Sequence, residues 1–179
     1  MIFFRMQTNR FSRLLLLLFL FSTSLEALPQ TSDKHTILPT VDISPLLAEK
    51  KTNPEAPTYS ITITVTNIRN KEGVLRFKFH DDKTPFQHET GFLRIVVPKT
   101  AFEGDSFTVT YTGFPSKNMA IALGDDENNN VELDMGWFYP KEGHAFSDYY
   151  HTAFRRPVYD DFDFFLDSDR KVLMKMRYY

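Results

Sequence analysis

From Tyr59 onward, apolar and polar residues alternate one by one, and this pattern limits the chain to a fold built from strands. In Tyr59–Arg69, isoleucine and valine alternate with threonine, so this strand has one buried face and one wet face. Val74–His80 alternates again, with leucine and phenylalanine opposite arginine and lysine. The short turn Asn70–Gly73 joins the two runs, which together predict a β-hairpin.

Later segments repeat this pattern, and no segment predicts a convincing helix. The further predicted strands are Gly91–Val97, Ser106–Thr112, Asn118–Gly124, Asp161–Leu166 and Lys171–Tyr178. The pattern predicts an all-β fold, a single β-sandwich of about seven strands that is Greek-key, immunoglobulin-like or transthyretin-like. The chain has no cysteine, which excludes disulfides and thiolate metal sites, so the core alone must hold the fold together.

The N-terminal segment, residues 1–27, has the three parts of a secretory signal peptide. Three arginines precede the apolar run Leu14–Phe21, and the small residues of Ser22–Ala27 suit a signal peptidase. We expect cleavage after Ala27, with Ser24 as the second choice. An uncleaved anchor is disfavoured, because a membrane-spanning helix needs about 20 apolar residues. The protein is therefore expected to be exported to the periplasm or outside the cell, with no transmembrane anchor after cleavage.

The rest of the chain divides into a leader and one domain. Residues 28–57 are rich in proline and scattered charge, which predicts a flexible leader, with a short helix or an edge strand near Ser44–Lys50 as the alternative. Residues 58–179 form the predicted β-sandwich domain. Removal of three arginines and one glutamate with the signal peptide changes the formal net charge from -2 to -4, so we expect no nucleic-acid partner.

One long connection, Asp125–Asp160, contains no clear strand or helix, and long structured loops often carry function. Its acidic part has oxygen-bearing side chains at positions one, three, five and nine, namely Asp126, Asn128, Asn130 and Asp134. Calcium-binding loops use this spacing, which makes calcium the candidate cofactor. Val131 stands where such a loop needs glycine and Trp137 where it needs glutamate, so we expect weak affinity. The alternative is a polar turn whose side chains bond to their own backbone.

The remainder of this connection is rich in aromatic residues. Trp137, Tyr149 and Tyr150, with His144 beside them, are the candidates for a platform that binds a sugar or a peptide. The alternative is that the rings pin the loop over one open end of the sandwich, because so much apolar surface is costly to leave in water. His144, Asp148 and His151 are also the best candidates for a catalytic or zinc-binding group.

Several motifs, taken in order, resemble a known family. They are the hairpin Ile61–Phe79 with Asn67, Ile68, Arg69 and Gly73, the loop Asp126–Asp134, the run Pro140–Gly143 with Phe146 and Ser147, and Pro157 with Asp161 and Phe162. Over Tyr59–Tyr179 the chain is similar to bacterial secreted proteins grouped as domain of unknown function number twenty-one forty-one. The family tends to have glycine where this chain has Asn129 and Val131, and often has histidine where it has Asp125, which weakens the transfer of any metal role. The resemblance implies export in a bacterium and a compact β-sandwich, and it implies no activity.

These observations predict a non-catalytic binding or accessory domain that uses the acidic and aromatic loop 126–159 as its working surface. A glycan, a peptide or an envelope protein is the expected partner. The sequence has no nucleophile elbow, no zinc-protease motif and no phosphate-binding glycine loop, so we expect no enzyme activity. Two alternatives stay open: a small metal-dependent hydrolase centred on His144, Asp148 and His151, and a purely structural envelope protein. The hydrolase requires those three side chains to converge on one cleft.

Overall fold

Strands form where the alternation predicts them, and the described residues contain three additional short strands. The computed structural model describes residues 34–47, 55–81, 91–131, 140–152 and 155–179. The seven predicted strands correspond to β3 (Thr58–Thr66), β4 (Val74–His80), β5 (Leu93–Pro98), β6 (Ser106–Pro115), β7 (Lys117–Asp126), β9 (Asp163–Leu166) and β10 (Arg170–Lys175). The additional strands are β1 (His35–Ile37), β2 (Val41–Asp42) and β8 (His144–Phe146).

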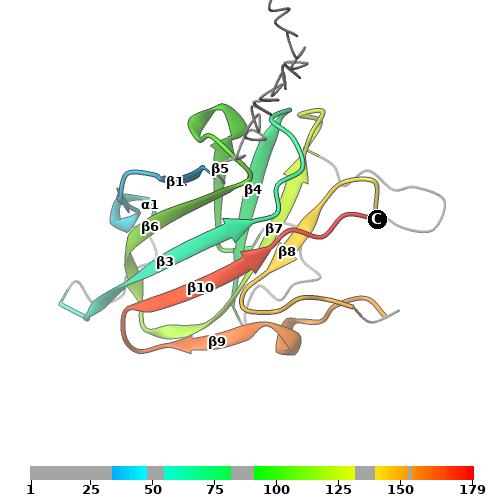
Figure 1. Cartoon of the computed structure of the whole chain (residues 1–179). Helices are drawn as coiled ribbons and strands as arrows, with labels where there is room; N and C mark the ends of the chain where they lie inside the picture. The colour runs from blue at the N-terminus through cyan, green and yellow to red at the C-terminus, as the bar shows by residue number, and fades with distance from the viewer. Residues whose placement is uncertain (1–33, 48–54, 82–90, 132–139, 153–154) are drawn as a thin grey trace, which may run out of the picture. The chain divides into compact units, whose positions relative to one another are not determined.

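The strands form two five-stranded sheets, which we name sheet A and sheet B. Sheet A has the order β1-β6-β3-β10, and β2 also pairs with β6; sheet B has the order β5-β4-β7-β8, and β9 also pairs with β7. In the orientation of Figure 1, sheet A lies in front of sheet B. The predicted all-β character is confirmed, whereas the finer immunoglobulin-like or transthyretin-like type stays a prediction.

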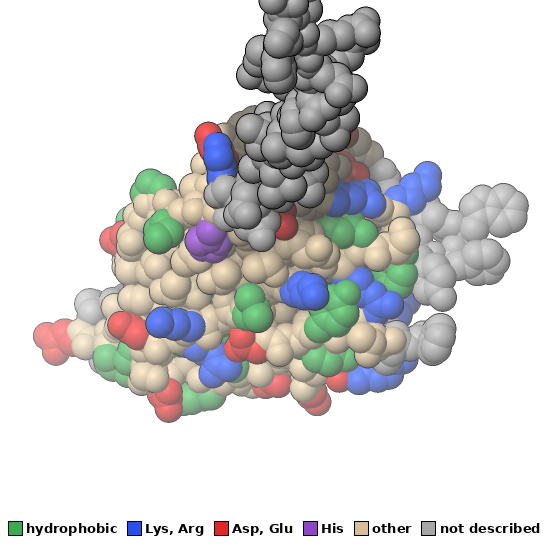
Figure 2. Space-filling model, in the orientation of Figure 1, with side chains coloured by type: hydrophobic (Ala, Val, Ile, Leu, Met, Phe, Trp, Pro, Cys, Tyr) green, Lys and Arg blue, Asp and Glu red, His purple; other side chains and the backbone are tan. Residues whose placement is uncertain are grey.

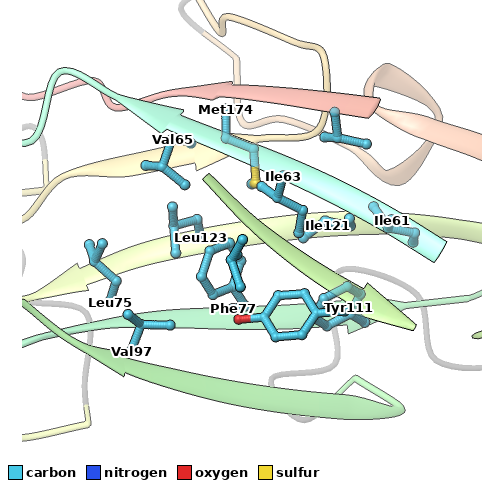
Figure 3. Packing of buried hydrophobic residues seen from close by; sticks show 14 of the residues in the cluster. Ile61, Ile63, Val65, Leu75, Phe77, Val97, Tyr111, Ile121, Leu123 and Met174 are labelled. Atoms are coloured by element: carbon cyan, nitrogen blue, oxygen red, sulfur yellow. The ribbon is translucent and has the colours of Figure 1, made fainter. Parts of the chain in front are cut away.

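The core lies between the two sheets and is built from the alternating apolar residues. Ile61, Ile63 and Val65 of β3 are fully buried, as are Leu75, Phe77 and Phe79 of β4. Figure 3 shows the labelled side chains of this core, which come from both sheets, pointing toward one another. The ring of Tyr111 packs edge-on against Phe77 at a centroid distance of 6.2 Å and against Phe79 at 6.3 Å. Aromatic rings in this geometry add specific contact energy to the burial of apolar area.

Residues 34–47 belong to the two-sheet domain, so the prediction of a flexible leader is wrong for this part of residues 28–57. Strands β1 and β2 both pair in parallel with β6. They are followed by a short helix, α1 (Ser44–Leu47), and Leu47 joins Ile43 in the core. The helix agrees with the alternative predicted near Ser44. Proline-rich composition did not reveal this pairing, because the pairing depends on the exposed edge of a distant strand.

The long connection contains more structure than its sequence predicted. Strand β8 pairs with β7, and the short 3₁₀ helix η3 (Tyr159–Asp161) lies at the end of the connection. His144 in β8 also exchanges two backbone hydrogen bonds with Arg177, with N···O distances of 3.0 and 2.9 Å. This pairing joins the edge of sheet B to the chain that follows β10. A strand of three residues is too short to give an alternation signal, so the prediction of a connection without strands is wrong.

Among the residues that the structure describes, no helix is long and apolar enough to cross a membrane. The predicted signal peptide lies outside these residues, so cleavage and export stay predictions.

Candidate functional site

Aromatic rings from the long connection and from Phe162, just after it, cover part of the outer face of sheet B. Phe146 and Phe162 pack together at a centroid distance of 4.6 Å and form a second buried cluster with Ala120 and Ala122 of β7. Alternate residues of β7, Ile121 and others, face the main core, so these alanines point outward. The rings therefore fix the connection onto the face of a sheet rather than over an open end of the domain.

The three candidate catalytic side chains each make separate structural contacts. Asp148 accepts hydrogen bonds from the backbone N–H of Leu173 at 2.8 Å and from the guanidinium of Arg170 at 3.0 Å. The two ring nitrogens of His151 bond to the Tyr149 hydroxyl at 3.0 Å and to the Arg155 carbonyl at 2.8 Å. Within the described residues, no group of three or more His, Cys, Asp or Glu side chains is placed to hold a metal ion.

His144 lies half-buried between aromatic rings. Its ring centroid is 5.5 Å from that of Phe146 and 5.7 Å from that of Tyr179. Burial, reinforced by the nearby charges of Arg177 and His151, lowers the pKa of His144 to about 4. His144 is therefore neutral at pH 7 and acts as a packed ring on β8.

The lowered pKa of His144 makes stability depend on pH. Between about pH 6.5 and pH 4 the unfolded chain binds a proton that the folded chain does not, so stability falls as the pH drops through this range. We expect a loss of about 1–2 kcal/mol between pH 6.5 and pH 4.5, after allowance for solvent screening at the half-buried ring. Urea unfolding at both pH values should show this loss in the wild type and a much smaller one in His144→Phe. Equal losses in the two proteins would contradict the assignment.

The acidic part of the connection forms a tight turn held by its own side chains. The carboxylate of Asp126 accepts hydrogen bonds from Arg76 at 2.5 Å and from the backbone N–H groups of Asn130 and Val131, both at 3.0 Å. The Asn128 side chain also accepts a bond from the N–H of Asn130, at 3.0 Å. Burial raises the pKa of Asp126, but these hydrogen bonds outweigh burial and hold it below its usual range.

Two residues of this turn, Asn129 and Val131, adopt left-handed backbone conformations, with φ of 63° and 73°. Such conformations favour glycine and are unfavourable for a β-branched residue. Asp134 and Trp137 lie outside the described residues, so the calcium site of Asp126, Asn128, Asn130 and Asp134 stays a prediction. The hydrogen bonds of Asp126 agree with the alternative of a polar turn.

A buried polar network, which the sequence did not reveal, lies beside this turn. Lys99 begins the 3₁₀ helix η2 (Lys99–Ala101), and its ammonium contacts the carboxylate of Asp125 at the end of β7. Both side chains are fully buried. Asn70 accepts a hydrogen bond from Lys99 at 2.7 Å, and the hydroxyl of Tyr178 donates one to Asp125 at 2.7 Å. A lysine inside the apolar sequence of residues 95–102 was the signal that could have indicated its burial.

A second, partly exposed ion pair lies beside this network. Arg69 forms two hydrogen bonds to Glu127, at 2.6 and 2.7 Å, and its guanidinium lies 4.5 Å from the centre of the Tyr178 ring. These hydrogen bonds hold the pKa of Glu127 below its usual range. The acidic residues at the end of β7 are thus neutralised by cations of the same domain.

The outer face of sheet A is uncharged at its centre and cationic along β10. Threonines of β3 and β6 face each other there, and two cross-strand pairs, Thr62 with Thr110 and Thr64 with Thr108, are hydrogen-bonded at 3.0 and 2.9 Å. Figure 2 views this side of the molecule, where blue Lys and Arg side chains and green hydrophobic ones lie among tan backbone and other side chains. The register of β10 with β3 places Lys171, Leu173 and Lys175 alongside Thr62, Thr64 and Thr66.

We name the group Tyr150, Lys171, Leu173 and Lys175 the β10 surface. Leu173 is 53% exposed and Tyr150, from the long connection, is 47% exposed. The ammonium of Lys175 lies 5.3 Å from the centre of the Tyr150 ring. Within the described part of the chain, no carboxylate lies within ion-pair distance of Lys171 or Lys175. The β10 surface therefore combines two unpaired cations with exposed apolar groups.

Of the three candidate ligand-binding residues that the structure describes, Tyr150 is the exposed one. Tyr150 is part of the β10 surface, whereas Tyr149 packs against Phe146 and bonds to His151. His144 is half-buried, and Trp137 lies outside the described residues. The binding role of these residues stays a prediction.

A family match now places the chain among known sequences. The family described as "Uncharacterized protein conserved in bacteria (DUF2141)" matches residues 63–173. The chain belongs to this family. The resemblance to DUF2141 inferred from the sequence motifs is therefore confirmed. The part matched to DUF2141 begins in β3 and ends in β10, so it includes Lys99, Asp125, Lys171 and Leu173. No curated protein and no solved structure matches the chain significantly.

Proposed function

We propose that the protein is an exported, non-catalytic binding domain of the bacterial envelope, and that the β10 surface binds an anionic glycan. The observation that supports this proposal is the pair of exposed lysines on β10, Lys171 and Lys175, which have no ion-pair partner among the described residues. Lys175 also lies over the exposed ring of Tyr150. Unpaired, exposed cations attract carboxylate, sulfate or phosphate groups, and their effect weakens with salt. An exposed tyrosine offers an apolar ring and a polar tip to a sugar.

The neighbouring threonines supply hydrogen bonds for the same ligand. In the pair of Thr62 with Thr110, one hydroxyl donates to the other, so the accepting hydroxyl still has its own proton to donate. Thr108 of the other pair is also bonded to the ring of His35, at 2.9 Å. A flat strand surface of this kind suits an extended chain of sugars. The proposal retains the predicted contribution of the 126–159 loop through Tyr150, and it moves most of the binding surface to β10.

The hydrolase alternative receives no support from the described geometry. Asp148 and His151 are both engaged by neighbouring groups, and His144 is a half-buried neutral ring. A general acid or base must reach its substrate with a free nitrogen or oxygen.

Charge reversal on β10 tests the proposal. We expect Lys171→Glu and Lys175→Glu each to weaken binding to a polyuronate, measured by isothermal titration calorimetry, by about tenfold, or roughly 1.4 kcal/mol. Added salt should weaken wild-type binding more than that of either variant. Lys141→Glu is the matched control, because it makes the same charge change at an exposed lysine that is not part of the β10 surface, and it should change the affinity little.

Two outcomes would contradict the proposal. One is an absence of wild-type binding to the polyuronate, and the other is an equal loss in Lys141→Glu, which would indicate a general charge effect. Equal binding to single-stranded DNA would indicate a non-specific polyanion site.

A further inference from the structure

The pair Lys99 and Asp125 has a geometry that ordinary ion pairs lack. Both side chains are completely removed from solvent, and Nζ of Lys99 contacts Oδ1 of Asp125. Each partner is also held by a second group: Nζ donates to the Asn70 side chain at 2.7 Å, and Oδ2 of Asp125 accepts from the Tyr178 hydroxyl at 2.7 Å. The amine and the carboxyl group are therefore fixed against each other in a dry site.

We propose that Lys99 and Asp125 condense to form an intramolecular isopeptide bond. The bond links β7 to η2, which directly follows the edge strand β5. It makes a covalent connection across sheet B in a chain that has no cysteine. This cross-link is independent of the proposed glycan binding, because neither the pair nor its hydrogen-bond partners Asn70 and Tyr178 belong to the β10 surface.

The condensation needs no atoms other than those of Lys99 and Asp125. Nζ of Lys99 bonds to Cγ of Asp125, and the bond from Cγ to Oδ1 breaks. Oδ1 leaves as water with two of the three ammonium protons, and the third proton stays on the amide nitrogen. Nothing is oxidised or reduced. The Tyr178 hydroxyl bonds to Oδ2, where negative charge develops in the tetrahedral intermediate, so it stabilises that charge.

The surrounding hydrogen bonds fit the product as well as the reactants. The new amide N–H can keep donating to Asn70, and the new carbonyl oxygen, Oδ2, can keep accepting from Tyr178. The atom that leaves, Oδ1, is buried and accepts no hydrogen bond of ordinary geometry, although it contacts the ammonium. The amide thus satisfies every polar atom that the condensation leaves buried.

The dry site also favours the uncharged form of the Asp125 carboxyl group. Burial raises the pKa of the Asp125 carboxyl, although the hydrogen bonds of Lys99 and Tyr178 oppose this effect. When two opposite charges are buried, the free energy of hydration that they lose can exceed the free energy gained from their attraction. Proton transfer from ammonium to carboxylate then gives a neutral amine next to a neutral acid, and their fixed contact supplies a high effective concentration.

Mass spectrometry of the denatured wild-type protein tests the bond directly. With the N-terminus identified, the intact mass should be lower than the sequence mass by one water molecule. Trypsin should fail to cut after Lys99 and should release a branched peptide in which residues 95–117 are joined to residues 118–141. Asp125→Ala and Lys99→Met should each restore the sequence mass.

The wild-type peptide map decides the question even if these variants fail to fold. Lys117→Met removes a partly exposed lysine that pairs with Asp81, and it should keep the loss of one water. A sequence mass with normal cleavage after Lys99 would overturn the proposal. A loss of one ammonia, with Asn70 in the branched peptide, would also overturn it, because the bond would then involve the other neighbour of Lys99.

Discussion

Replacement of Phe146 by alanine is expected to lower the free energy of unfolding by about 3–5 kcal/mol, the range found for buried aromatic rings. Phe146 is only 4% exposed and packs against Phe162 and the alanines of β7. Its loss leaves a cavity between the long connection and sheet B. Chemical denaturation at constant pH measures the effect.

Phe165→Ala is the matched control for Phe146→Ala, because the ring of Phe165 is 60% exposed on β9. Its removal should change stability by about 0.5 kcal/mol or less, as for most surface substitutions. A small loss in Phe146→Ala would mean that the connection is held to sheet B by its backbone pairing alone. The buried cluster of Phe146 and Phe162 would then contribute little to stability.

Gly73→Ala is expected to destabilise the protein by about 2–4 kcal/mol, from backbone strain and steric overlap together. Gly73 has φ of +70°, and a Cβ atom there would lie 2.0 Å from the carbonyl oxygen of Asp126. The turn between β3 and β4 must therefore approach the end of β7 without a side chain. Thermal and urea unfolding of the variant measure the loss.

Gly124→Ala, one residue before the buried Asp125, provides the control for Gly73→Ala. A Cβ atom at Gly124 would meet no atom within 4 Å, and its φ is not in the left-handed region. We expect its stability to stay within about 0.5 kcal/mol of the wild type. Similar losses of stability in both variants would show that the close approach of Gly73 to Asp126 does not make alanine unfavourable at position 73.

The strands could be predicted from sequence because alternation is a local signal. Ile61 and Phe77 stand in runs long enough to distinguish a period of two from other patterns. Strand β8 lacked this signal, since three residues contain too few alternations. Strand β1 was missed because it depends on an edge of β6, which lies far away in the sequence.

The candidate site was predicted less well, because side-chain partners are not local. The spacing of Asp126, Asn128 and Asn130 fitted a calcium loop, yet it fits equally well a turn that binds Arg76 and its own backbone. The pairing of Lys99 with Asp125 depends on how η2 meets the end of β7, which composition does not encode. The binding role predicted for Tyr150 stays a prediction, and its neighbour Lys175 on β10 could not be found from the sequence because the two are brought together by the pairing of the long connection with β10.

The parallel pairing of β3 with β10 has a consequence for the order of folding. These strands are neighbours in sheet A, although the side-chain contact beside them, Asp169 with Ser60, spans 109 residues of sequence. A chain still leaving a ribosome or a secretion channel lacks β10, so one edge of β3 and part of its buried face stay uncovered. Such non-local contacts form slowly, because loop closure precedes any gain from packing. The two-sheet domain therefore completes its folding only after β10 has been released and can pair with β3.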